Sequence, residues 1–111
     1  MKKLLLILLF PFLTFSQNQC DDDICVIHFN AGWNEVNSVD WLEKLTDCGV
    51  LYIDIVTDPG SQKEYEIVVV PTIIVFNGKE VKRFQADISF SMQATKKEVQ
   101  AVVDEILMDS F

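Results

Sequence analysis

The sequence predicts an α/β domain built on a mixed four-stranded sheet, with its elements in the order β-α-β-α-β-β-α. One observation is that short runs of β-branched and aromatic residues alternate with segments of helical periodicity. This alternation indicates parallel strands joined by right-handed crossovers. The other is the dipeptide Asn77-Gly78 between two apolar runs, which is the strongest short signal for a hairpin. The hairpin adds an antiparallel edge to the predicted sheet.

Four short apolar runs predict the strands. Residues 24–30 are rich in β-branched and aromatic types, which is typical of a buried strand. Turn residues such as Asp58-Pro59-Gly60 separate the later runs. The other three predicted strands cover residues 50–56, 72–76 and 81–86.

The first predicted helix covers residues 35–46. Asn34 is a favoured N-cap, and Glu35 in the first turn suits the helix dipole. Apolar residues recur every three positions and mark the face expected to be buried. These residues are Val36, Val39, Leu42 and Leu45.

Two further helices complete the pattern. Residues 61–67 predict a short helix before the third strand. The last helix begins with Thr95 and Glu98, which have the spacing of a capping box. An apolar stripe at helical spacing follows and predicts its buried face. It consists of Val99, Val102, Val103 and Ile106.

The first 16 residues have the layout of a cleaved signal peptide. A basic start precedes a short apolar run, and small residues stand before a cut ahead of Gln17. A membrane anchor is disfavoured, because the run is shorter than the roughly 20 residues that a bilayer requires. Residues 17–23 are then expected to form a flexible acidic segment, and residues 24–111 the folded domain.

Charge restricts the partners of such a chain. Cleavage would leave 7 basic and 17 acidic residues, a formal net charge of −10. This excess repels nucleic acid and anionic membrane surfaces. We therefore expect an exported domain, periplasmic or extracellular, with no nucleic-acid partner and no stable membrane anchor after cleavage. Disulfides persist in these compartments.

The element order and two local motifs resemble the thioredoxin family. Residues 29–37, Phe-Asn-Ala-Gly-Trp-Asn-Glu-Val-Asn, lie at the strand-to-helix turn where thioredoxins carry Phe-x-Ala-x-Trp-Cys-x-x-Cys. Val70-Pro71-Thr72 is similar to the family's cis-proline loop. The resemblance covers residues 24–108 and implies a thioredoxin-like three-layer sandwich in a compact version, without the extra N-terminal strand and helix of larger thioredoxins.

The resemblance also implies that the usual redox pair is missing. Asn34 and Asn37 stand where the family has its two cysteines, and an amide forms no thiolate and is no nucleophile at neutral pH. His28 stands where the family commonly buries an acid. We expect it to be a core histidine with a satisfied hydrogen bond. On this basis the sequence predicts no catalytic residue at the motif.

The resemblance further implies a peptide groove beside the motif. It would consist of Trp33, Asn34, Val70 and Pro71, with a cis peptide bond before Pro71. The backbone of Val70 would then pair with an extended peptide.

Three cysteines remain outside the motif. Cys20 and Cys25 lie before and at the start of the first predicted strand, and Cys48 follows the first helix. We expect a structural disulfide between Cys48 and either Cys20 or Cys25, and the sequence does not choose between them. Cys25 as a buried free thiol is the alternative. No metal is expected, because Cys25 and His28 point to opposite faces of a strand.

The leading functional hypothesis is an exported, redox-inactive module that binds an extended peptide or a partner protein without a cofactor. The first alternative is a thiol-disulfide oxidoreductase that uses Cys20, Cys25 or Cys48. The second alternative is a structural domain without a groove ligand.

Overall fold

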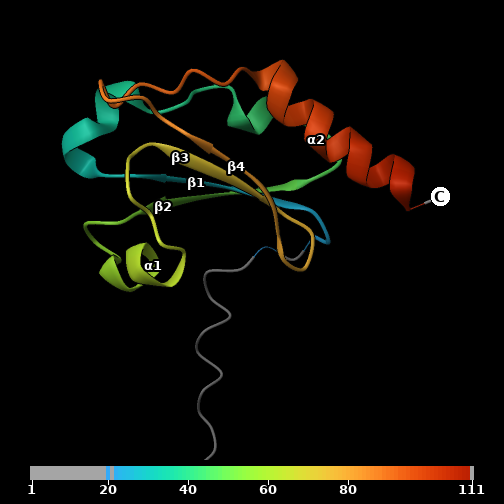
Figure 1. Ribbon diagram of the computed structural model, residues 1–111, viewed down its shortest axis with the longest axis horizontal. Coiled ribbons are helices and arrows are strands. Elements are labelled where there is room, and N and C mark those ends of the chain that lie inside the picture. The colour runs from blue at the N-terminus through green and yellow to red at the C-terminus, as the bar shows by residue number, and fades with distance from the viewer. Residues whose placement is uncertain (1–19, 21, 111) are drawn as a thin grey trace, which may run out of the picture.

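The computed structural model of the protein describes residue 20 and residues 22–110 (Figure 1). The expected signal peptide, residues 1–16, and most of the acidic segment 17–23 lie outside the described residues. Within the described part of the chain, no helix is both long enough and apolar enough to cross a membrane.

A mixed four-stranded sheet forms the centre of the domain, as predicted. Its strands lie in the order β2-β1-β3-β4, with β1 parallel to β2 and the other two pairs antiparallel. All four strands begin and end within two residues of the predicted positions. They are β1 (Cys25–Asn30), β2 (Gly49–Asp54), β3 (Thr72–Phe76) and β4 (Glu80–Gln85).

The direction of β3 differs from the sequence prediction. Parallel pairing was expected wherever a helix separates two strands, yet β3 runs antiparallel to β1 and therefore to β2. The reason is the length of helix α1 (Pro59–Glu64) between β2 and β3. Six helical residues span about 9 Å, whereas a six-residue strand spans about 20 Å. Helix α1 is too short to return the chain along the sheet, so β3 starts near the end at which β2 stops.

Helices cover both faces of the sheet and produce the predicted three layers (Figure 1). Helix α2 (Lys96–Asp109) packs Val99 and Val103 against one face, where Val26 and Val75 are completely buried. On the other face lie α1 and the segments that flank it. The core of that face contains Cys25, Ile27, Phe29, Ile53, Ile55, Ile67 and Ile74.

Local sequence signals correctly predict the start of α2 and the hairpin between β3 and β4. Thr95 and Glu98 form the predicted capping box, since the Thr95 side chain accepts from the Glu98 backbone and the Glu98 side chain accepts from the Thr95 backbone. At the hairpin between β3 and β4, Gly78 has a φ of 84°. Only glycine adopts this conformation without strain, which explains its place in the turn.

The first predicted helix, residues 35–46, is wrong. The structure has two 3₁₀ turns there, Gly32–Asn37 (η3) and Leu42–Lys44 (η4), and Ser38 between them is extended. The backbone N–H of Val39 donates to His28 Nε2 at 3.2 Å instead of to a helical carbonyl. A side chain that binds a backbone N–H group competes with the helical hydrogen bond of that group. Here the competing side chain comes from the preceding strand.

The apolar face predicted for that helix is only partly buried. Val39, Leu42 and Leu45 are buried as expected, whereas Val36 is 93% exposed. The predicted N-cap role of Asn34 is also wrong, because the 3₁₀ turn begins after Ala31 and Asn34 lies inside it.

Candidate functional site

Three asparagines near the carboxyl end of β1 form a buried network of amide hydrogen bonds. The Nδ2 group of Asn34 donates to Asn30 Oδ1 at 3.1 Å, to Phe90 O at 3.1 Å and to Val70 O at 3.4 Å. Its Oδ1 accepts from Asn37 Nδ2 at 2.8 Å. Asn34 is only 4% exposed. Its side chain therefore links three segments of the fold and has no polar atom left over for a ligand.

The four residues predicted to form a peptide groove lie close together. The peptide bond between Val70 and Pro71 is cis, as the resemblance implies. Val70 and Pro71 are nevertheless buried, as is Asn34, and Trp33 alone of the four is exposed. Trp33 packs edge-on against Phe90, with ring centroids 5.4 Å apart. The described loop that carries Phe90 thus contacts both Trp33 and Asn34.

His28 is the satisfied core histidine that the sequence predicted. It is 2% exposed, accepts a hydrogen bond from the Val39 backbone, and lies 5.2 Å from the ring of Tyr52. Burial lowers the pKa of His28 from 6.5 to about 4, because desolvation penalises the charged imidazolium. His28 is therefore neutral at physiological pH.

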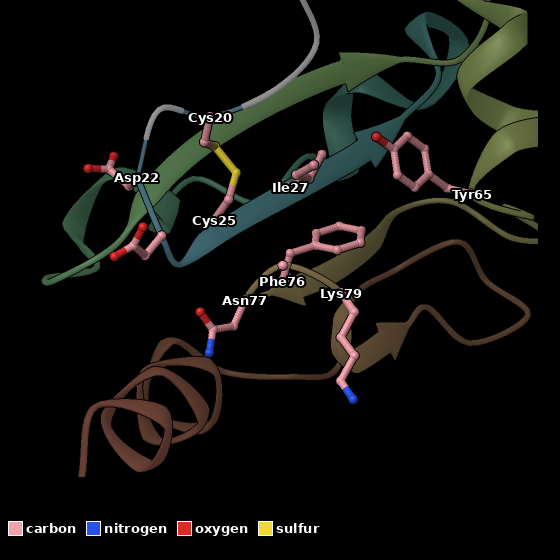
Figure 2. Close-up of a pocket in the computed structure, with 10 residues that line it drawn as sticks. Cys20, Asp22, Cys25, Ile27, Tyr65, Phe76, Asn77 and Lys79 are labelled. Carbon is pink, nitrogen blue, oxygen red and sulfur yellow. A yellow bond between two sulfur atoms is a disulfide. The ribbon is translucent and has the colours of Figure 1, made fainter. Parts of the chain in front are cut away.

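A disulfide joins Cys20 to Cys25 at the opposite, amino end of β1 (Figure 2). Their Cα atoms are 5.9 Å apart. The predicted bridge from Cys48 to either of them is wrong, and Cys48 carries a free thiol. Cys25 belongs to the α1 face of the sheet, whereas Cys48 packs against the α2 face. The two side chains therefore point to opposite sides of the sheet.

The environment of Cys48 disfavours its thiolate. It is half-buried, and burial raises the pKa of its thiol, with further increases from the negative charges of Asp22 and Asp47. A thiol held in this protonated form is a poor nucleophile. Cys48 is thus a poor candidate for a nucleophile.

The Cys20–Cys25 disulfide lies in the wall of an open pocket of about 610 Å³. Figure 2 shows Ile27, Phe76 and Tyr65 on the same side of the sheet as the two sulfur atoms. Cys20 is partly exposed, whereas Cys25 is 7% exposed. An incoming group can therefore reach the sulfur of Cys20 more easily than that of Cys25.

The pocket exists because α1 covers only part of its face of the sheet. The helix ends at Glu64, and Tyr65 directly after it packs on Phe29 and on Phe76, at centroid distances of 5.1 Å and 5.6 Å. Beyond Tyr65, toward the start of β1, no helix of the described residues covers the face (Figure 1). Cys25 lies directly opposite Phe76 in the antiparallel register, and both residues line the pocket.

Charged residues stand around the pocket. Asp22 and Asp23 lie beside Cys20, and Lys79 lies on the hairpin across from them. The carboxylate of Asp22 lies over Gly49, at a position where any larger side chain at 49 would collide with it. The Cys20 side of the pocket is therefore negative. Within the described residues, no group of three His, Cys, Asp or Glu side chains is arranged to hold a metal ion.

Comparison with known proteins identifies the fold. No protein-family profile and no curated protein matches the chain. Solved structures do match. A mutant thioredoxin from Halobacterium salinarum superimposes with a TM-score of 0.61 at 21% identity, over 77% of this chain and 75% of that one.

Two other similar structures are also thioredoxins. Thioredoxin 1 from Thermosipho africanus gives a TM-score of 0.57 at 19% identity, over 78% of this chain and 97% of that one. The germline-specific thioredoxin Deadhead from Drosophila melanogaster gives 0.55 at 18%, over 78% and 83%. This chain therefore has a thioredoxin-like fold, as its sequence predicts.

These findings overturn the leading functional hypothesis of a redox-inactive binding module. A disulfide between Cys20 and Cys25 is present on a thioredoxin-like fold. Sequence reasoning treated Cys20 and Cys25 as parts of a structural staple. It also missed Tyr65 and Phe76 as pocket residues.

A sequence signal for the pocket does exist. Cys25 and Ile27 alternate along a strand and therefore share a face. The aromatic residue that ends the third strand lies next to them once that strand pairs with the first.

Proposed function

We propose that the domain is a thiol-disulfide oxidoreductase whose redox pair is Cys20 and Cys25. The observation that carries the proposal is the Cys20–Cys25 disulfide, partly exposed in the wall of an open pocket. A disulfide in reach of solvent can accept a thiolate, whereas a fully buried one cannot. The thioredoxin-like fold supports the proposal, because the similar structures named above are thioredoxins.

The exchange proceeds in two balanced steps. A substrate thiolate attacks the sulfur of Cys20, the bond between Cys20 and Cys25 breaks, and Cys25 leaves with the electron pair and takes up a proton. A second substrate thiolate then attacks the substrate sulfur of the mixed disulfide and expels Cys20, which also takes up a proton. The substrate gains one disulfide and loses two protons and two electrons, and the protein gains two thiols. In reverse, the reduced pair reduces a substrate disulfide.

The position of the disulfide argues against a purely structural role. It closes a loop with a sequence separation of 5, and a loop of this size contributes only about 2 kcal/mol in the chain-entropy model. It connects the segment before β1 to the first residue of that same strand. No two elements of the sheet are held together by it, so reduction leaves the fold intact.

We infer that Asn34 and Asn37 occupy the place of the cysteine pair in the thioredoxin motif. The sequence around them supports this assignment, since Trp33 precedes Asn34 and the cis-proline Pro71 lies beside it. Their amides are bound to each other and to the backbone. Redox chemistry in this domain is thereby assigned to the other end of β1.

We further propose that the substrate is a peptide or protein thiol and that the domain acts outside the cytoplasm. The signal-like first 16 residues support export. A disulfide in the folded chain is consistent with an oxidising compartment.

An insulin-reduction assay with dithiothreitol tests the proposed pair. The purified chain is expected to accelerate reduction above the dithiothreitol background, and Cys48→Ser to retain that rate. Cys20→Ser is expected to abolish it, because the remaining Cys25 is buried. In a Cys48→Ser background, Cys25→Ser is expected to trap a mixed disulfide on Cys20, which mass spectrometry detects.

The outcomes separate the three cysteines. Loss of activity in Cys48→Ser alone would assign the chemistry to Cys48 and overturn the proposed pair. A rate equal to background for the unaltered chain, with no mixed disulfide trapped in the variant, would overturn the proposed activity itself.

A further inference from the structure

We infer that the pocket beside the disulfide selects the substrate of the proposed exchange, on which this inference rests. The selected substrate is an extended peptide with a cysteine, a large apolar residue two positions after it, and a basic residue directly before it. The apolar side chain enters the pocket lined by Ile27, Tyr65 and Phe76. The basic side chain faces Asp22 and Asp23.

The apolar wall of the pocket is held in place before any substrate arrives. The ring of Tyr65 contacts Phe29 on one side and Phe76 on the other. Arg83 donates to the backbone oxygen of Tyr65 at 2.8 Å, and Glu80 in turn holds Arg83 at 2.9 Å. A wall fixed in this way needs little ordering when a side chain binds, which favours affinity.

Spacing along the sheet sets the position of the apolar residue. Cys25 and Ile27 lie two positions apart on β1 and share one face. In an extended chain such neighbours are about 7 Å apart. A peptide that lies along this face parallel to β1, with its sulfur at Cys20, therefore directs the residue two positions after its cysteine toward Ile27 and Tyr65. Figure 2 shows the ring of Tyr65 beyond Ile27 as seen from the disulfide.

The size of the pocket fits one large side chain with the adjacent backbone. Its volume is about 610 Å³, within the range of roughly 300–1,000 Å³ for small-molecule sites. Tyr65 and Phe76 are only partly buried. Their exposed ring surfaces are available to contact an aromatic or large aliphatic side chain, and such contact excludes water from both.

Charge sets the preference on the other side of the cysteine. Asp22 and Asp23 line the pocket beside Cys20, and both are exposed. The side chain of Lys79 extends away from the disulfide in Figure 2, so Asp22 and Asp23 are the charged lining residues on the Cys20 side of the pocket. A basic residue next to the substrate cysteine is attracted there, and an acidic one is repelled.

Four tetrapeptides test both preferences on the oxidised, full-length protein. They are Lys-Cys-Ser-Phe, Lys-Cys-Ser-Ser, Glu-Cys-Ser-Phe and Glu-Cys-Ser-Ser, each with blocked ends. Acid-quenched mass spectrometry gives the rate at which each peptide opens the Cys20–Cys25 disulfide. Each rate is divided by the rate of the same peptide with bis(2-hydroxyethyl) disulfide, which removes differences in intrinsic thiol reactivity.

Each Phe peptide is expected to open the disulfide about tenfold faster than its Ser counterpart. Partial burial of a large apolar side chain contributes enough free energy for a rate difference of this size. Lys peptides are expected to be about threefold faster than Glu peptides at low salt. The second difference is expected to disappear at about 1 M salt, where screening is nearly complete.

Matched variants locate the two preferences. Tyr65→Ala is expected to remove the Phe preference, and Tyr52→Ala, a tyrosine that lies beside His28 on the other face, to retain it. Asp22→Asn with Asp23→Asn is expected to remove the Lys preference. Glu35→Gln with Asp40→Asn changes the net charge equally at exposed positions away from the pocket and is expected to retain it.

Failure of the substrate preference and failure of the proposed activity give different results. Equal normalised rates for all four peptides, with the disulfide opened by each, would overturn this inference and leave the proposed activity standing. A Phe preference that survives in folded Tyr65→Ala protein would overturn the assignment to this pocket. If neither the peptides nor dithiothreitol opens the disulfide, the proposed activity itself fails.

Discussion

The two ends of β1 are built in opposite ways. At the carboxyl end, Asn34 is 4% exposed and its amide binds Asn30, Asn37 and two backbone carbonyls. At the amino end, the disulfide of Cys20 and Cys25 lies in an open pocket. One end is closed and hydrogen-bonded, whereas the other is open and carries the disulfide.

Stability and the proposed chemistry therefore depend on opposite ends of one strand. A buried amide with every partner in place stabilises a fold, because each unpaired group would cost free energy. An accessible disulfide gains little stability from its short loop but remains open to attack. Variants at the first end should therefore lower stability without changing exchange, and variants at the second end should change exchange at a smaller cost in stability.

The largest expected effect is that of Asn34→Leu. It leaves Asn30 and the carbonyls of Val70 and Phe90 without their donor, so the free energy of unfolding should fall by about 4 kcal/mol. Urea denaturation followed by tryptophan fluorescence measures the change. Exchange by the folded fraction should be unaffected, and a Leu variant as stable as the unaltered chain would show that the amide network contributes nothing.

Acid should destabilise the fold through protonation of His28, which lies toward the closed end of β1. Its pKa is about 4 in the fold, against about 6.5 when unfolded. Below a pH of about 6.5 the unfolded chain therefore binds a proton that the folded chain does not bind until about pH 4. As the pH falls through this window, the free energy of unfolding should decrease by about 3 kcal/mol in total. Above the window, the contribution of His28 should stay constant.

The matched control is His28→Gln, which keeps an acceptor for the Val39 backbone but does not titrate. Carboxylates titrate in both proteins, so the difference between their stability curves isolates His28. Denaturation at pH 7 and at pH 4 should show the larger loss in the unaltered chain. Parallel curves would mean that His28 takes up its proton equally in both states.

At the open end, removal of the disulfide should cost less. Cys20→Ala leaves the buried Cys25 in place and deletes only the bridge, so the free energy of unfolding should fall by about 2 kcal/mol. Urea denaturation of this variant, beside the chain reduced with dithiothreitol, measures the loss in two ways. A loss larger than that of Asn34→Leu would reverse the comparison and make the disulfide the main structural element.

Much of this fold follows from local signals in the sequence. The strands, the hairpin glycine Gly78 and the capping box of Thr95 and Glu98 are all as predicted, because each depends on residues close together in the chain. The first helix fails for a tertiary reason. The backbone of Val39 binds His28, which belongs to the preceding strand, and helical periodicity contains no information about that contact.

The candidate site was harder to predict, because it depends on distances that sequence spacing does not encode. The pairing of Cys20 with Cys25 requires that Cys48 face the other side of the sheet. The pocket requires that α1 end before it covers the start of β1. Resemblance to the family motif points to the end of β1 with the two asparagines. It contains no information about cysteines at the other end, for which spacing alone predicts a structural disulfide with Cys48.

The smallest expected effect is that of Trp33→Ala, at the exposed rim of the closed end. Trp33 is 65% exposed, and its main contact is the edge-on packing with Phe90. Loss of one such aromatic pair should lower the free energy of unfolding by about 1 kcal/mol. Exchange at Cys20 should be unchanged, because Trp33 and the disulfide lie at opposite ends of β1. A severalfold loss of the exchange rate in this variant would show that substrate contacts both ends, and would end the separation between them.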